Sequence, residues 1–207
     1  MRVSKTSSNH WRAIPTALIM VSACGHGART ASVPVPATGS TPGRIPAQIG
    51  RYRLTRRDGV NGFPNDSAYR FSDGSATRVT ALIYSIPPDV QVGPDSQSWT
   101  MREGEKFQEV QPLLVRRGAI EAFSVAFANS GEIKVENHSI PEHATAIAVR
   151  SRGNVTVDFQ YLYLVDGRFL KVRATVPSEG WERTDVPVFA RDLARRLATA
   201  DTARERH

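Results

Sequence analysis

Residues 155–176 read VTVDFQYLYLVDGRFLKVRATV, and they give the clearest tertiary inference in the chain. Two runs of alternating apolar and polar residues flank Asp166-Gly167, a pair that the type I′ turn of a two-residue hairpin prefers. With this pair at the centre of the turn, the residues facing one another on one side are Val165 and Arg168, Tyr163 and Leu170, Tyr161 and Val172, Phe159 and Ala174, and Val157 and Val176. Because a slip of one residue would reverse every side chain, the pattern predicts an antiparallel hairpin with one face in the core.

The opposite face of this hairpin mixes apolar and charged residues. Its facing pairs are Leu164 with Phe169, Leu162 with Lys171, Gln160 with Arg173, and Asp158 with Thr175. Lys171 and Arg173 are two residues apart, so both cations project from one strand face, where they could receive a carboxylate or phosphate of a partner. We therefore expect Lys171, Arg173 and Gln160 to form a partner-binding face. A solvated strand face, or internal pairing with Asp158 and nearby acids, is the simpler alternative.

Strands are also expected upstream of the hairpin. Residues 52–54 and 69–71 alternate apolar with polar side chains, which predicts strands buried on one side. Residues 78–86 are apolar at both odd and even positions, which predicts a strand covered on both faces. Residues 119–128 fit either a strand or a helix; alanine, glutamate and the stop signal at 129–131 favour a helix.

Two further helices are expected. Thr100 and Glu103 have capping-box spacing, which predicts a helix that begins at Thr100, and Pro112 must kink this helix or begin a second one. After the hairpin, a cap at residues 184–185 and a proline in the first turn precede an amphipathic run. Its apolar positions, four residues apart, are Phe189, Leu193 and Leu197.

This order of elements predicts one α+β domain over residues 50–200, with a largely antiparallel sheet packed against a long helix and a C-terminal helix. Residues 201–207 are expected to form a disordered tail. The order is similar to that of the PsbP/Mog1-like sandwich, which implies the same class of fold. Fold likeness of this kind transfers no function.

The N-terminus has the features of a secretory signal. Three basic residues precede an apolar run over residues 13–23, which is too short to span a bilayer, since that takes about 20 apolar residues. Val21-Ser22-Ala23-Cys24 ends this run with the chain's single cysteine and resembles the lipobox of bacterial lipoproteins. The resemblance implies that residues 1–23 are removed and that Cys24 receives a diacylglycerol and an N-terminal acyl chain. The alternative is cleavage near Ala23 by the ordinary signal peptidase, leaving a free thiol.

Composition and charge narrow the range of partners. Residues 24–49 are rich in proline, glycine, serine and threonine and are expected to form a flexible linker. The chain carries a net charge of +7; without residues 1–23 its 27 basic residues fall to 24 against 20 acidic ones, a net of +4. This mild excess does not favour a nucleic-acid partner. We expect a membrane partner through the N-terminal lipid anchor, together with an envelope protein or cell-wall component. The expected location is the cell membrane or outer membrane, facing the periplasm or the exterior.

Catalytic chemistry has few candidates. The single thiol is assigned to lipid, and no Gly-x-Ser-x-Gly elbow occurs. His138, Glu142 and His143, with Glu136 nearby, are the one cluster with metal-ligand chemistry, but their spacing matches no zinc signature. We therefore predict no catalytic residue, metal or cofactor, and a non-catalytic binding or accessory module. The alternatives are a hydrolase-like periplasmic enzyme and a module that senses a small ligand.

Overall fold

The computed structural model describes residues 45–60, 63–86, 96–136 and 138–202. Within these residues, eight strands form one antiparallel sheet in the order β1-β2-β3-β4-β8-β7-β6-β5. The strands are β1 (Gln48–Ile49), β2 (Tyr52–Val60), β3 (Phe63–Ser72), β4 (Arg78–Ser85), β5 (Phe123–Val135), β6 (His138–Ser151), β7 (Asn154–Val165) and β8 (Arg168–Pro177). The helices are α1 (Ser96–Glu109), α2 (Gln111–Arg116) and α3 (Val186–Thr202), with a 3-10 turn at Trp181–Arg183. The predicted α+β class and antiparallel sheet are confirmed.

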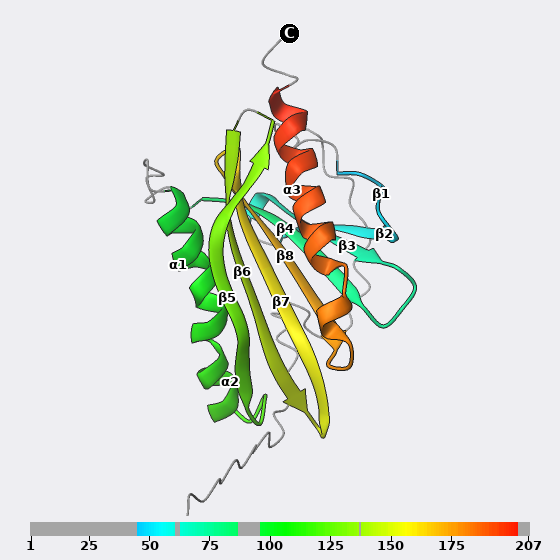
Figure 1. Cartoon of the computed structure of the whole chain (residues 1–207), viewed down its shortest axis with the longest axis vertical. Helices are drawn as coiled ribbons and strands as arrows, with labels where there is room; N and C mark the ends of the chain where they lie inside the picture. Colours follow the sequence, from blue (N-terminus) through cyan, green and yellow to red (C-terminus); the bar gives the residue numbers. More distant parts are fainter. Residues whose placement is uncertain (1–44, 61–62, 87–95, 137, 203–207) are drawn as a thin grey trace, which may run out of the picture.

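The helices lie on opposite faces of the sheet (Figure 1). Helix α1 packs on β5, β6 and β7, and α3 packs across the other face against β1, β5, β7 and β8. The larger core lies under α3, where the ring of Phe189 meets the rings of Tyr52 and Phe71 at centroid distances of 5.0 and 4.9 Å. A smaller core lies under α1 and α2 around Phe107 and Ile147. The sheet is therefore the middle layer of three.

The hairpin of residues 155–176 has the predicted register. Strands β7 and β8 pair so that Val165 faces Arg168, Tyr161 faces Val172 and Val157 faces Val176. Asp166 and Gly167 have φ angles of 48° and 70°, the positive values that a type I′ turn requires at both central positions. The turn therefore fixes which side chains of the hairpin face α3 and which face α1.

Several other predictions are confirmed. Val79, Ala81 and Ile83 of β4 are buried, and the alternate side chains Leu82 and Tyr84 are half-buried, so this strand is covered on both faces. Proline 112 lies in the first turn of α2, so it separates that helix from α1. In α3, the three apolar residues spaced four apart are all buried: Phe189, Leu193 and Leu197.

Two local predictions are wrong. Helix α1 begins at Ser96, and Thr100 lies inside it, where its Oγ1 donates a hydrogen bond to the carbonyl of Ser96 (2.9 Å). Thr100 is therefore no cap. Residues 123–128 belong to strand β5, which pairs with β6 from Phe123 opposite Val149 to Val135 opposite His138. This long pairing, rather than local helix propensity, decides the conformation of the segment.

The described fold extends past both ends of the expected domain. Strand β1 pairs with β2 before residue 50, and the side chain of Ile49 is only 1% exposed. Helix α3 continues to Thr202. The signal sequence, Cys24 and the linker as far as residue 44 lie outside the described residues.

Candidate functional site

Helix α1 covers the part of the hairpin where a partner-binding face was expected. The Lys171 ammonium donates to Glu103 Oε1 (3.1 Å) and lies 5.0 Å from the centre of the Tyr84 ring. Tyr84 donates its hydroxyl to the same carboxylate oxygen (2.9 Å), and Lys106 donates to Oε2 (2.6 Å). The Lys171 side chain is 18% exposed, and burial lowers its pKa, an effect that the Glu103 charge opposes. Lys171 therefore already has its anionic partner inside the domain.

Glu103 is the centre of this group of side chains. Burial raises the pKa of its carboxyl, but the hydrogen bond from Lys106 and the charge of Lys171 outweigh burial and hold the pKa below its ordinary value. The carboxylate consequently joins α1 to β8 and, through Tyr84, to β4.

Gln160 and Arg173 are also covered. Gln160 is buried and donates its amide to the Gly104 carbonyl of α1 (3.3 Å). The Arg173 guanidinium lies 4.7 Å from the centre of the Phe107 ring, a cation–π contact, and burial lowers its pKa while Asp158 raises it. The expectation of an open face at Lys171, Arg173 and Gln160 is therefore wrong. The hairpin lies in the middle of the sheet, so both of its faces are covered.

The histidine cluster is divided between the two faces of the sheet. His143 faces α1, where its Nδ1 is 2.8 Å from Ser130 Oγ and its Nε2 is 3.0 Å from Thr145 Oγ1. A serine next to an imidazole is the arrangement of nucleophile and base, but here a threonine occupies the position where a triad carboxylate would orient the ring. The ring is also buried, which lowers its pKa. Within the described residues, no group of three or more potential metal ligands forms.

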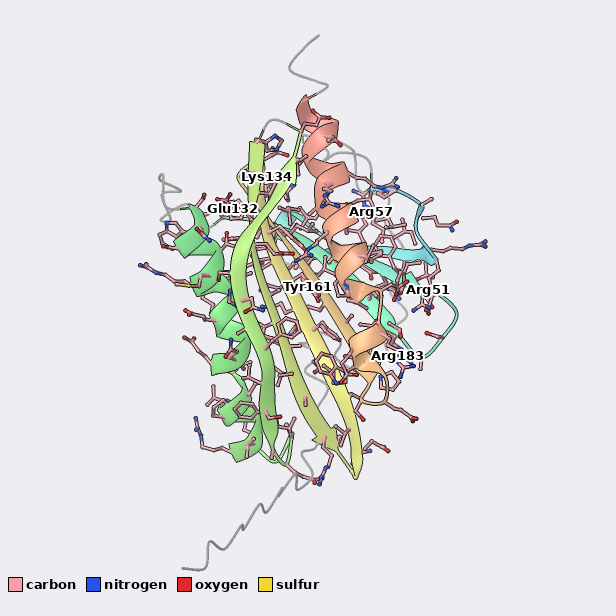
Figure 2. All side chains as sticks on the ribbon, viewed as in Figure 1. Arg51, Arg57, Glu132, Lys134, Tyr161 and Arg183 are labelled. Atoms are coloured by element: carbon pink, nitrogen blue, oxygen red, sulfur yellow. The ribbon has the colours of Figure 1, made fainter. Side chains whose placement is uncertain are left out.

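Glu142 belongs to a separate group under α3. Its carboxylate receives two hydrogen bonds from the Arg191 guanidinium (3.0 and 2.9 Å) and one from the Tyr163 hydroxyl (2.9 Å). Tyr161, two residues before Tyr163, lies on the same face beside α3 (Figure 2), and burial raises its pKa. The arrangement fastens α3 to the sheet and leaves the Glu142 carboxylate fully engaged.

The structure brings together four arginines that no sequence motif connects. Strand pairing places Arg53 opposite Ser72, Ser72 opposite Arg78, and Arg78 opposite Thr175. The neighbouring row runs across the same strands on the same face: Arg56, Arg70, Thr80 and Arg173. We call these residues the arginine face, leaving out Arg173 because α1 covers it; the face then consists of four arginines and three hydroxyl residues. The alternation of polar and apolar residues within β2, β3 and β4 indicates that each strand has a polar side. The pairing register across β2, β3, β4 and β8 is needed to place these polar residues next to one another.

The arginine face is accessible and positively charged. Arg53, Arg56, Arg70 and Arg78 are exposed, because α1 packs on β5, β6 and β7 and so lies to one side of them. Asp58 pairs with Arg56 (2.6 Å) and Arg70 (3.5 Å), whereas Arg53 and Arg78 form no ion pair within the described part of the chain. Arg57, between Arg56 and Asp58 in β2, projects from the opposite face and lies near α3 (Figure 2).

Comparison with known proteins assigns no family. No protein-family model matches the chain, and no curated protein matches it significantly. In the described ranges, no helix is both long enough and apolar enough to cross a membrane.

Proposed function

We propose that this chain is a bacterial lipoprotein of the cell envelope, held in the membrane by lipid on Cys24. Its α+β domain acts as a binding or accessory module rather than as a catalyst. The lipobox-like residues Val21-Ser22-Ala23-Cys24 support the anchor, and the arginine face is the observation that supports binding. Exposed guanidinium groups interleaved with hydroxyls are suited to carboxylate or phosphate ligands.

The polar side chains that could act as a base or nucleophile are instead bound to neighbouring side chains, which favours binding over catalysis. The imidazole of His143 is held between two hydroxyls, and Glu142 is neutralised by Arg191. Lys171 is paired with Glu103. A general base or nucleophile needs access to substrate, and these groups are satisfied by neighbouring side chains instead.

The anchor is tested by labelling the full chain with palmitate in a bacterial host. Cys24→Ser should abolish incorporation, because the thiol is the attachment atom, whereas Ser22→Ala keeps a small residue in the lipobox and should retain it. Palmitate incorporation that persists in Cys24→Ser would refute the anchor.

The binding role is tested by cross-linking the lipidated protein in its own envelope, followed by mass spectrometry. A reproducible contact that maps to β2, β3 or β4 supports the module. Turnover of an ester or amide substrate that depends on Ser130 and His143 would instead establish the enzymatic alternative.

A further inference from the structure

We propose that the arginine face docks on the anionic lipid headgroups of the membrane that holds the anchor. This inference rests on the proposed function, because the lipid on Cys24 brings the domain to that membrane. The occupant is a surface of phosphate groups, and the contact is electrostatic.

The chemistry of the face suits phosphate. Along one row, arginine and hydroxyl residues alternate from strand to strand as Arg53, Ser72, Arg78 and Thr175; in the next row, Thr80 lies beside Arg70. Neighbouring strands are about 4.8 Å apart, so a phosphate above one arginine also comes within reach of a hydroxyl on the next strand. Guanidinium groups bind phosphate oxygens through paired N–H donors, which a hydroxyl donor can supplement.

The charge balance of the face favours an anion. Its four arginines are opposed by Asp58, which pairs with two of them, and by Asp158 on the adjoining strand β7. Asp158 accepts a hydrogen bond from Thr175 and is half-buried, so burial raises the pKa of its carboxyl. Arg53 and Arg78 are exposed, form no ion pair with any described residue, and lie on either side of Ser72.

The position of the tether favours a membrane over a free polyanion. Twenty residues separate Cys24 from Ile45, where the described chain begins, so the domain can lie at most about 70 Å from the anchor. That chain enters the sheet at β1, which pairs with β2, the strand that carries Arg53 and Arg56. A tether of this length converts headgroup contact into an intramolecular event and raises the effective concentration of lipid at the face. Each basic residue near an anionic leaflet adds about 1 kcal/mol to the attraction, with or without the tether.

The test measures binding of the mature chain, residues 24–207 with Cys24→Ser, to lipid vesicles by flotation. Vesicles of equal parts phosphatidylglycerol and phosphatidylcholine are compared with vesicles of phosphatidylcholine alone. Binding is expected only to the anionic vesicles and should weaken as salt concentration rises, because salt screens exposed charges. The double variant Arg53→Gln, Arg78→Gln should lose about thirtyfold in affinity, the loss expected for two basic contacts.

The matched control is Arg195→Gln, Arg196→Gln, which removes the same charge from exposed positions of α3 on the other side of the sheet. It should bind within about twofold of the parent chain, since these residues lie away from the face.

Equal losses in both double variants, or equal binding to neutral and anionic vesicles, would overturn the proposal. Binding to soluble polyphosphate without binding to vesicles would also overturn it and assign the face to a polymer. The vesicle assay uses a chain without lipid, so a lack of vesicle binding would not bear on whether Cys24 is lipidated. Palmitate incorporation that does not depend on Cys24 would likewise leave the measured binding of the arginine face to vesicles unchanged.

Discussion

The imidazole ring of His143 lies directly beneath the α-carbon of Gly104. A Cβ on Gly104 would overlap Cδ2 of that ring and lie 2.9 Å from its Nε2. Gln160 donates to the carbonyl of the same glycine, so α1 is held against β6 and β7 at this point by packing and by a hydrogen bond. The absence of a side chain at position 104 therefore sets the distance between helix and sheet.

Gly104→Ala should destabilise the domain although alanine favours helices. The gain in helix propensity is at most about 1 kcal/mol, whereas overfilling a packed site costs about 1–3 kcal/mol. The Cβ would meet a ring rather than the end of a flexible chain, so α1 must move. We expect the free energy of unfolding to fall by about 1–2 kcal/mol in urea denaturation.

Two controls accompany this variant. Gly131→Ala in β5 meets no atom within 4 Å and should change stability by less than about 0.5 kcal/mol. Gly104→Ala in a His143→Ala background should cost much less than in the parent chain, because the ring is gone. Equal costs in the two backgrounds would contradict the contact.

The stability of the domain should fall as pH drops below the ordinary histidine pKa of 6.5. Burial lowers the pKa of His143 in the folded state, so the unfolded chain binds a proton at a higher pH than the folded one. The stabilisation is fully present above pH 6.5 and is lost as pH falls through the folded pKa, with a slope of up to about 1.4 kcal/mol per pH unit. Urea denaturation across this range should show a flatter profile for His143→Gln. His138→Gln, at an exposed position, should keep the parent profile; identical profiles for all three chains would exclude His143 as the source.

The sequence was informative wherever the deciding interactions are local. Asp166 and Gly167 tolerate the positive φ that a type I′ turn needs at both central positions, and the alternation of apolar residues on either side agrees with the register that this turn sets. The hairpin could therefore be predicted from neighbouring residues. Residues 123–128 fit two periodicities, and the choice depended on pairing with β6. Local propensity could not supply that partner.

The candidate site was less predictable because it depends on long-range packing. Lys171 and Arg173 do share one face of β8, as expected, but nothing in their spacing showed that α1 would pack over that face. The arginine face requires the pairing of β4 with β8, two strands that are far apart in the sequence. From the composition, these arginines are visible only as a mild excess of positive charge, and the composition says nothing about where they lie.

Lys171→Glu should destabilise the domain strongly, and Lys171→Met should not. The glutamate would place a second carboxylate beside Glu103 in a site that is mostly covered, and breaking a buried pair in this way costs about 3–5 kcal/mol. Methionine keeps the volume of the side chain, and Glu103 retains the hydrogen bonds from Lys106 and Tyr84, so a loss of about 1 kcal/mol is expected. Chemical denaturation measures both. Parent-like stability of Lys171→Glu would mean that Lys171 is free to meet an external partner.

The contacts of Glu142 should be strongly non-additive. Arg191→Met leaves a buried carboxylate without its cation and should cost about 3 kcal/mol, whereas Tyr163→Phe removes one hydrogen bond and should cost about 1 kcal/mol. Adding Glu142→Gln to Arg191→Met removes the uncompensated charge and should restore much of the loss. Arg195→Met, whose exposed guanidinium is 3.6 Å from Asp192, serves as the control and should change stability by less than about 0.5 kcal/mol. If Arg191→Met and Arg195→Met were equally mild, the bidentate pair would contribute no more than a surface contact, and α3 would be held to the sheet by its apolar residues alone.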